Sequence, residues 1–528
     1  MYSRTSQNMD MVSSSGGIWE RVSRHPGLLP ALTFVALCLC IAFADFSTKG
    51  EPREALVAAD MLRSGNWVLP IDQNGDMAYK PPMFHWLVAL FSLPAGHVSE
   101  FTSRLPSAIS LTLLLMLVYK YCTSASRERG FGMLCAAFTL TCFEVLRAGT
   151  VCRVDMLLTL FITGGMICLF RAAREHRWQM YLYAVLYMSG GALTKGPVAV
   201  ILPLGAWWVW QLSERKNFFS VSGKAFLLAV AAMISPMLWY AAAWHQGGDK
   251  FLTLALEENF GRFMGKMSYD SHVQPLWYNF TSLLAGLLPW SLLLAATVFL
   301  PRMRGSWNLF RSWKQTWAGM CPEARFALVA STVVFVFYCI PKSKRSVYLL
   351  PMYPFMAYGL GCYAQALVRR GVMSVKFLSR TLVTVCALLF AGFAVGFPIY
   401  SRHNSDRIKA EEIASIVPAG DIYTFIPDRF MRFYITDFYT GGRLVSLLPS
   451  GQVDVGERTF SADKMRLPSE GTFYLLTSAD ITDGRADKDF GLHRWLEDNA
   501  LTATEVYRST SRGHDVKRHF VLLKIARK

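Results

Sequence analysis

The chain has 528 residues, 53% of them hydrophobic and 14% aromatic, with a mean hydropathy of +0.28. This composition excludes an ordinary soluble domain, because several apolar stretches are long enough to cross a hydrocarbon core of about 30 Å. The net charge of +17 does not require a nucleic-acid partner, since Lys and Arg are retained on the cytoplasmic side of multi-span membrane proteins.

The cysteines and the N-terminal residues narrow the class of protein further. Most of the 11 cysteines lie in apolar stretches, residues 401–528 contain none, and no Cys/His cluster has the spacing of metal ligands. The polar residues 1–27 precede an apolar stretch that lacks a small-residue cleavage site. We therefore expect a cytoplasmic N-terminal segment and a retained first span rather than a signal peptide.

Apolar stretches recur along residues 28–400, which we interpret as one transmembrane catalytic domain. Because backbone polar groups in lipid must be hydrogen-bonded within the chain, these stretches should be helices. Their lengths predict a polytopic α-helical fold with about eleven spans. The predicted spans lie near residues 28–44, 105–119, 130–146, 154–170, 179–193, 197–212, 225–243, 276–300, 326–340, 347–367 and 381–400.

The basic residues indicate the orientation of the spans. If the N-terminus is cytoplasmic, the inner loops are rich in Lys and Arg and poor in acids, as the positive-inside rule requires. These loops are "KYCTSASRER", "RAAREHR", "SERKNFFSVSGK", "PRMRGSWNLFRSWKQ" and "RRGVMSVKFLSR". Residues 401–528 then lie outside, and their 19 Lys/Arg against 18 Asp/Glu place the basic excess in the membrane part.

Three outer segments, residues 50–86, 147–155 and 341–346, break this rule because they carry Lys and Arg. An anionic group held at the outer face would explain them, since Lys and Arg bind phosphate by charge and by forked hydrogen bonds. The alternative is that a few outer basic residues are simply tolerated. The convergence of these loops on one face favours an anion site.

The first outer loop, residues 45–104, is expected to contain two short surface helices. Residues 53–63 repeat apolar side chains at helical spacing but also carry charges that do not suit a spanning helix. Pro81 and Pro82 are placed to begin a second helix after Lys80.

Two acids at this face are candidates for catalysis. Glu51 precedes Pro52 at the expected start of the first surface helix, and Asp155 lies at the outer end of a span. Each could simply stabilise a helix N-terminus or cap it. An acid near lipid is costly unless it is paired or functional, and two carboxylates among cations suit a reaction that develops charge. We therefore take Glu51 and Asp155 as the candidate catalytic pair.

The order of the motifs resembles a known family. The segment "GEPREALVAADMLRSGNWVLPIDQNGDMAYKPPMFHWL" resembles the first periplasmic loop of bacterial aminoarabinose lipid A transferases. These belong to the wider dolichyl-phosphate-mannose–protein mannosyltransferase clan, which has the GT-C fold. The resemblance covers roughly residues 28–360. The further matches, in order, are "GTVCRVDMLLTLF", "TKGPVAV", "EENFGRF", "HVQPLWYNFTSLLAGLLPW" and "PKSKRSVYLLP".

The resemblance implies transfer of a sugar, with inversion, from a polyprenyl phosphate to an acceptor at the outer face of the bacterial inner membrane. Carried over residue by residue, Arg53 and Lys80 would hold the lipid phosphate, and Asp155 matches an acid required near the sugar. The other implied substrate-binding residues are Tyr79, Lys195, Arg262, His272, Lys342, Lys344 and Tyr348.

Two positions depart from the family pattern. Gly50 stands where the family usually has Asp or Asn, so any role of that side chain passes to Glu51. Tyr79 stands where the family often has Glu, which removes a carboxylate that relatives could use for a metal. We therefore predict no metal ligands and name no cofactor, and a divalent metal stays open. The departures suggest a branch whose sugar need not be aminoarabinose, so aminoarabinose and a related sugar are both open.

Some candidates also have a plainer interpretation. Lys195, at the start of a span, could be an anchor whose ammonium group reaches the interface. His85 and His272 lie near Trp and could be packed at the interface without a chemical role.

Residues 401–528 carry no family motif. The β-rich runs "DIYTFI", "GTFYLLTS" and "HFVLLKI" and the helical stretch "DRIKAEEIASIV" predict a small periplasmic α/β domain, long enough for its own core. Acceptor gating and plain stability are both open as its role.

The sequence therefore predicts a membrane glycosyltransferase that modifies lipid A or another envelope acceptor. A protein O-glycosyltransferase of the same clan would differ only in its acceptor. A transporter of lipid-linked sugars would place ionisable residues near the bilayer midplane and often show internal repeats, whereas these charges lie at span ends. An interaction scaffold would leave the outer cations unexplained.

Overall fold

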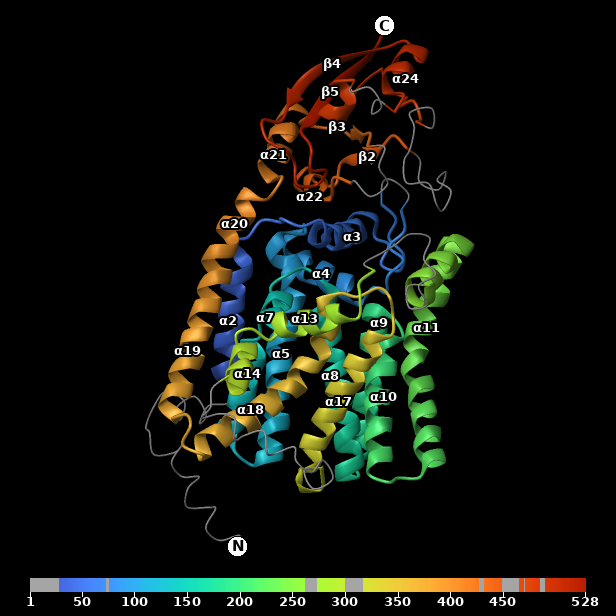
Figure 1. Cartoon of the computed structure of the whole chain (residues 1–528). Helices are drawn as coiled ribbons and strands as arrows, with labels where there is room; N and C mark the ends of the chain where they lie inside the picture. Colours follow the sequence, from blue (N-terminus) through green and yellow to red (C-terminus); the bar gives the residue numbers. More distant parts are fainter. Residues whose placement is uncertain are drawn as a thin grey trace.

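The computed structural model of the chain describes residues 28–72, 76–261, 273–299, 317–426, 432–448, 465–469, 471–484 and 490–528. Most of these residues form a bundle of helices, and a β-sheet formed near the C-terminus lies at one end of the bundle (Figure 1). The bundle matches the predicted helical class, and the sheet falls in the part predicted to be α/β.

Helices occur at the apolar stretches, as their composition requires in lipid. In the first part of the chain they are α2 (Leu28–Ala42), α5 (Glu100–Ser126), α6 (Arg129–Leu140), α7 (Phe143–Gly149), α8 (Val154–Glu175), α9 (Trp178–Lys195), α10 (Val198–Ser213) and α11 (Phe218–Leu256), followed by the π-helical turn η2 (Glu257–Gly261). In the second part they are α13 (Trp277–Gly286), α14 (Trp290–Phe299), α17 (Pro322–Cys339), the 3₁₀ turn η4 (Ser346–Met352), α18 (Tyr353–Arg369), α19 (Val375–Ala391), the π-helical turn η5 (Gly392–Gly396) and α20 (Phe397–His403).

Several predicted spans are broken rather than continuous. The chain bends by 75° between α6 and α7 and by 105° between α13 and α14. The span expected at 347–367 begins as η4 and becomes α-helical only at Tyr353, where Pro351 and Pro354 supply no backbone N–H. Lys195 ends α9 instead of starting a span, and Gly196 follows it with φ +78°. Among the described residues, 5 helices are long and apolar enough to cross a membrane, or up to 7 if each bent pair is one span.

Two short helices form in the first outer loop, at the places that the sequence predicts. They are α3 (Gly50–Ser64) and α4 (Met83–Ser92), which is followed by the 3₁₀ turn η1 (Leu93–Ala95). Pro82 is the N-cap of α4, and Ser99 caps α5 by accepting a hydrogen bond from the Thr102 N–H. Helix α3 runs across the end of the bundle, between the membrane helices and the C-terminal sheet (Figure 1).

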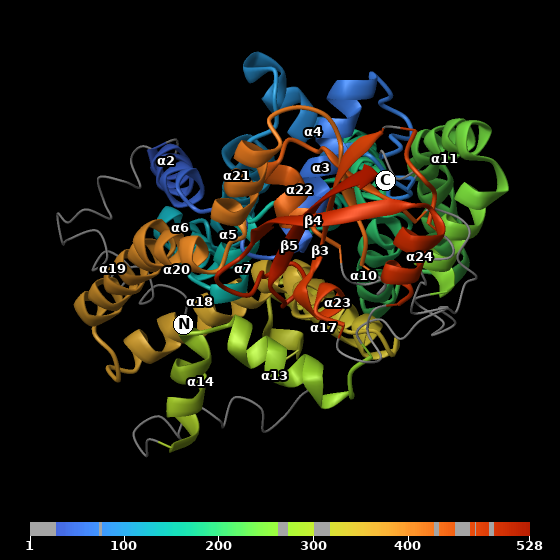
Figure 2. The same cartoon turned by 90° about the horizontal axis from the view of Figure 1, so that it is seen from above.

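The bundle has an inner and an outer set of helices. Helix α8 is mostly buried, whereas α11 and α19 keep most of their apolar side chains exposed, as lipid-facing helices do. Helices α2 and α19 lie on one side of the molecule and α11 on the opposite side (Figures 1 and 2). The outer end of α8, where Asp155 lies, therefore sits near the middle of the bundle.

The C-terminal part forms a mixed sheet in the order β2-β1-β3-β5-β4. Its strands are β1 (Ile422–Thr424), β2 (Leu444–Ser446), β3 (Thr472–Ser478), β4 (Leu501–Arg508) and β5 (Phe520–Arg527). Its helices are α21 (Arg407–Ile416), α22 (Tyr434–Tyr439), α23 (Ala479–Thr482) and α24 (Leu492–Asp498). The first two predicted β-rich runs contain β1 and β3, the third covers all of β5 except its last two residues, and the predicted helical stretch contains α21. Figure 2 shows this sheet covering α3 and α22 from above.

Candidate active site

A cavity of about 940 Å³ opens where α7 and the N-terminal end of α8 meet α3, η4 and the η5–α20 segment. Its charged lining residues are Glu51, Arg147, Arg153, Asp155, Lys344 and Arg345. Apolar side chains from α19, η5 and α20, including Leu388 and Phe393, line another part of it. The cavity thus combines cations and two carboxylates with an apolar wall next to lipid-facing helices.

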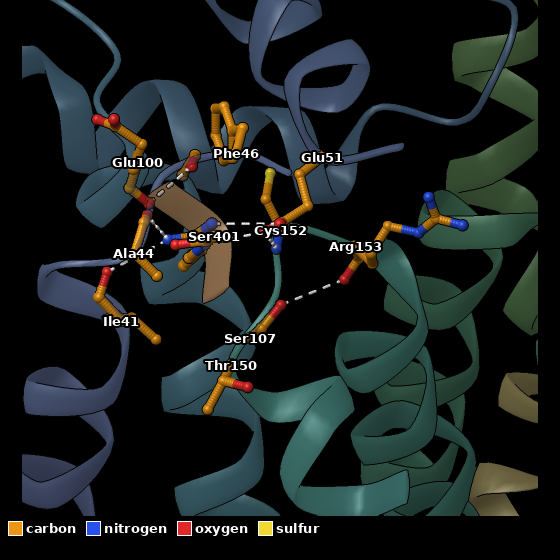
Figure 3. Close-up of polar contacts among 12 residues, drawn as sticks. Ile41, Ala44, Phe46, Glu51, Glu100, Ser107, Thr150, Cys152, Arg153 and Ser401 are labelled. Carbon is orange, nitrogen blue, oxygen red and sulfur yellow. Dashed lines mark hydrogen bonds and ion pairs between the residues drawn. The ribbon is translucent and has the colours of Figure 1, made fainter. Parts of the chain in front are cut away.

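Glu51 is fixed within this site by a buried arginine. Arg104 donates from Nε to Oε1 of Glu51 at 2.8 Å and from Nη2 to Oε2 at 3.1 Å, and the Cys152 N–H donates to Oε1 at 2.9 Å. Figure 3 shows Glu51 and Cys152 in this cluster. Both partners are almost fully buried, so the ion pair is weakly screened by water and holds the carboxylate in one orientation.

Arg104 also joins the first outer loop to the bundle. Its guanidinium donates to the carbonyls of Ala44 and Asp45 and lies 5.0 Å from the centre of the Phe46 ring. Neither the charge pattern nor the family motifs singled out Arg104, because it lies next to a predicted span, where a buried arginine is unexpected. The matching acid is 53 residues away in the chain.

Asp155, Lys195 and Tyr348, which the sequence placed in the same site, are brought together. Lys195 Nζ donates to Asp155 Oδ1 at 2.6 Å and lies 4.7 Å from the centre of the Tyr348 ring. The Tyr348 ring in turn stacks on Tyr338 at 5.2 Å. The end of α9, the start of α8 and η4 therefore meet around one ion pair.

A second cluster beside the cavity contains Arg53 and Lys80. Both donate to Oε1 of Glu54, Lys80 at 2.6 Å and Arg53 at 3.0 Å, and His85 Nε2 lies 2.9 Å from Oε2. Burial of Glu54, the largest effect, opposes ionisation, but Lys80, His85 and Arg53 together hold its pKa well below the usual value. Glu54 was not among the predicted site residues, although it follows Arg53 directly.

The pKa of Lys80 is also lowered, which for a lysine favours the neutral form. Loss of water around its ammonium group lowers the pKa to about 8, even though Glu54 favours the charged form. Nearby Arg53 and Arg153 lower the pKa further. The side chain is still 31% exposed, so it is accessible to a ligand.

The other predicted residues lie in different surroundings. Lys344 is buried, lines the cavity, and donates from Nζ to the Pro341 carbonyl at 2.6 Å. Lys342 is exposed and does not line the cavity. The Tyr79 hydroxyl is 3.4 Å from Oε1 of Glu258. The predictions for Arg262 and His272 fall outside the described residues.

Arg147, Arg153 and Arg345 are cavity residues that the sequence did not assign. All three lie in the outer segments that break the positive-inside rule, so the charge pattern contained the signal without ranking them. Arg147 donates to both carboxylate oxygens of Glu144, at 2.9 and 2.7 Å. No group of three His, Cys, Asp or Glu that could hold a metal ion occurs in the described part of the chain.

Several known proteins have sequences similar to this chain. A family model described as dolichyl-phosphate-mannose-protein mannosyltransferase matches residues 79–240. An undecaprenyl phosphate-alpha-4-amino-4-deoxy-L-arabinose arabinosyl transferase from Sodalis glossinidius is 26% identical over 407 residues, which cover 73% of this chain and 69% of that protein. The corresponding transferase from Shewanella sediminis is 26% identical over 335 residues, which cover 61% of this chain and 57% of that protein.

Solved structures identify the fold. The crystal structure of ArnT from Cupriavidus metallidurans bound to undecaprenyl phosphate matches with a TM-score of 0.67 at 17% identity, over 94% of this chain and 97% of that chain. The apo form of the same protein matches with a TM-score of 0.65. The chain is therefore a helical membrane protein with the GT-C fold. Within that class, the chain resembles the ArnT structure and the named arabinosyl transferases.

Proposed function

We propose that this chain transfers a sugar from a polyprenyl phosphate to a lipid A-type or other envelope acceptor at the outer face of the bacterial inner membrane. The cavity carries this proposal, because it joins four cations and two carboxylates to an apolar wall beside lipid-facing helices. A polyprenyl phosphate needs both features, a site for its charged head and an apolar path for its chain. The relatives named for undecaprenyl phosphate-aminoarabinose support aminoarabinose or a related sugar.

The proposed step is a displacement at the anomeric carbon. An acceptor oxygen forms the new bond to that carbon, the bond from carbon to the phosphate oxygen breaks, and the phosphate leaves with the electron pair. The cations stabilise the charge on the departing phosphate, and they act more strongly at a partly desolvated rim than in bulk water. An ionised phosphate acceptor has no proton to lose, whereas a hydroxyl acceptor must give its proton to a base.

Two carboxylates, Asp155 and Glu51, are the proposed catalytic residues of this step. Asp155 lines the cavity with one oxygen bonded to Lys195, so it is placed to orient the sugar or the acceptor. Glu51 also lines the cavity, but Arg104 and the Cys152 N–H occupy its oxygens. We assign to Asp155 the direct contact with the sugar or the acceptor. We assign to Glu51 the role of orienting the residues at the rim of the cavity. Arg53, Lys80 and Lys344 are the proposed phosphate-binding residues, with Tyr79, Lys195 and Tyr348 beside them.

The proposed organisation follows the sequence prediction. Residues 28–400 form the catalytic membrane domain with about eleven spans, residues 1–27 are cytoplasmic, and residues 401–528 form a periplasmic domain. A protein O-glycosyltransferase is the second candidate, because the matching family model is described as a protein mannosyltransferase. A peptide hydroxyl would require a base in the cavity, and a lipid phosphate would not.

Purified full-length protein tests this function when it is incubated with undecaprenyl phosphate sugars and with either lipid A or acceptor peptides. Mass spectrometry should detect the glycosylated lipid. Asp155→Asn should lower kcat by about 100-fold or more, since a positioned carboxylate contributes on that order. Glu51→Gln should also lower it, because the amide breaks the pair with Arg104. Lys524→Ala, an exposed change in the C-terminal sheet, is the control. Turnover at the wild-type rate by both variants would show that neither carboxylate acts in the reaction.

A further inference from the structure

In the described part of the chain, no acceptor explains the position of the Arg153 side chain. Arg153 is the N-cap of α8, and its carbonyl accepts a hydrogen bond from Ser107 Oγ at 3.2 Å. Figure 3 shows its guanidinium pointing away from Ser107. The group lines the cavity, and no described residue accepts a hydrogen bond from it. Its charge acts on both Asp155 and Lys80, so it lies near both charged clusters.

Gly50 makes room for this side chain. An added Cβ at Gly50 would overlap with Nη1 of Arg153 and lie 2.9 Å from its Cζ. Gly50 is the first residue of α3 and is not among the described residues with positive φ, so the backbone does not require glycine there. The reason for glycine is therefore the space that the guanidinium occupies.

The neighbouring cations already have partners. Arg147 is paired with Glu144, Lys195 with Asp155, and Lys344 with the Pro341 carbonyl. Arg53 and Lys80 share Glu54. Arg153 presents a planar guanidinium without such a partner in a site that also contains two carboxylates, which suits an incoming anion with two oxygens.

On the basis of the proposed function, we propose that Arg153 binds a phosphate oxygen of a substrate and that Gly50 is what permits its approach. The phosphate belongs either to the polyprenyl donor or to the acceptor, and both present the same chemistry to the guanidinium. Any side chain at position 50 would force the guanidinium to leave this position.

A double-mutant cycle tests the coupling. Arg153→Ala should raise the KM for the substrate that carries the phosphate by about 10- to 100-fold, the usual range for a lost charged hydrogen bond. Arg153→Lys should recover part of the loss, because Lys keeps the charge but not the fork. Gly50→Ala should raise the same KM, and Gly50→Ala combined with Arg153→Ala should equal Arg153→Ala alone.

Two sets of kinetic measurements distinguish a phosphate of the donor from a phosphate of the acceptor. Varying the donor at saturating acceptor, and then the acceptor at saturating donor, shows which KM depends on Arg153. Binding of undecaprenyl phosphate alone, measured on purified protein, gives a readout without turnover. If the wild type transfers no sugar, the proposed function fails, while this binding measurement still tests a role of Arg153 at the donor.

Controls distinguish binding from folding. Gly223→Ala, where an added Cβ meets no atom within 4 Å, should leave KM unchanged and should not lower thermal stability, because Ala favours the helix in which Gly223 lies. A normal KM for both substrates in Arg153→Ala would overturn the proposal. Additive losses in the double variant would show that Gly50 acts independently of Arg153. A loss that follows thermal stability, with no recovery in Arg153→Lys, would show a purely structural role.

Discussion

At the Glu54 carboxylate, Arg53, Lys80 and His85 meet within hydrogen-bonding distance. The sequence predicted Arg53 and Lys80 as phosphate-binding residues but did not predict this buried acid between them. A carboxylate can hold both cations in place before a phosphate arrives, and the phosphate then competes for the same donors. In the proposed function, the acid would keep the site assembled and would reduce the gain from phosphate binding.

Deprotonation of Lys80 should lower the activity of the enzyme at alkaline pH. Its pKa is lowered to about 8, chiefly by loss of water, so the side chain is cationic below that pH and becomes neutral above it. If the cation binds donor phosphate, kcat/KM for the donor should be flat near pH 7 and fall as pH rises through about 8. A pH profile of initial rates at low donor concentration measures this.

Lys80→Arg provides the matched variant for that profile. Arg stays protonated at every accessible pH, so the alkaline decrease should disappear even if the absolute rate is lower. A profile that keeps the same decrease in Lys80→Arg would assign the titration to another group.

At the scale of elements, α22 of the C-terminal part packs directly on α3. Phe46, Ala55 and Ala58 share a buried cluster with Ile435, and the rings of Phe46 and Phe438 are 4.7 Å apart. The Tyr439 hydroxyl accepts from the Phe46 N–H and donates to Glu100, each at 2.9 Å. The helix that carries Glu51, Arg53 and Glu54 is thus held from above by the C-terminal part.

Phe438→Ala should therefore impair both stability and catalysis. Loss of a partly buried ring costs about 1–3 kcal/mol and leaves α3 less constrained. We expect a lower thermal unfolding temperature and a reduced kcat/KM at a temperature where the variant is still folded. Tyr423→Ala is the matched control. Tyr423 packs against Phe473 in a hydrophobic core of the C-terminal sheet, separate from the cluster that contains Phe438. Equal kcat/KM in the two variants would show that α22 does not position α3.

The sequence predicted the positions of the helices better than their shapes. Hydropathy located α8, α17 and α19 because a spanning helix must be apolar along its length. It did not predict the 75° and 105° bends, because hydropathy does not register a helix break, although Pro289 between α13 and α14 supplies no backbone N–H. The loop charges pointed to the site region, but the Arg104–Glu51 pair depends on packing between residues 53 positions apart.

At the scale of the molecule, the proposed chemistry requires the cavity and the C-terminal sheet to be on one side of the membrane. The sheet lies at the same end of the bundle as α3, which lines the cavity (Figure 1). The loop between α10 and α11, with Arg215 and Lys216, lies at the opposite end of α10 from the TKGP turn near the site. By the positive-inside rule we therefore predict that this loop is cytoplasmic and that the sheet is periplasmic.

Cysteine labelling in whole cells tests this orientation. Arg494→Cys, at a side chain 85% exposed on α24, should react with a membrane-impermeant maleimide once the outer membrane is made permeable. Lys216→Cys, exposed in the α10–α11 loop, should react only after lysis. The parent chain with its 11 cysteines sets the background, and residues 401–528 contribute none to it. Labelling of Lys216→Cys in intact cells, with Arg494→Cys protected, would place the cavity in the cytoplasm, where the proposed acceptor of the envelope is not exposed.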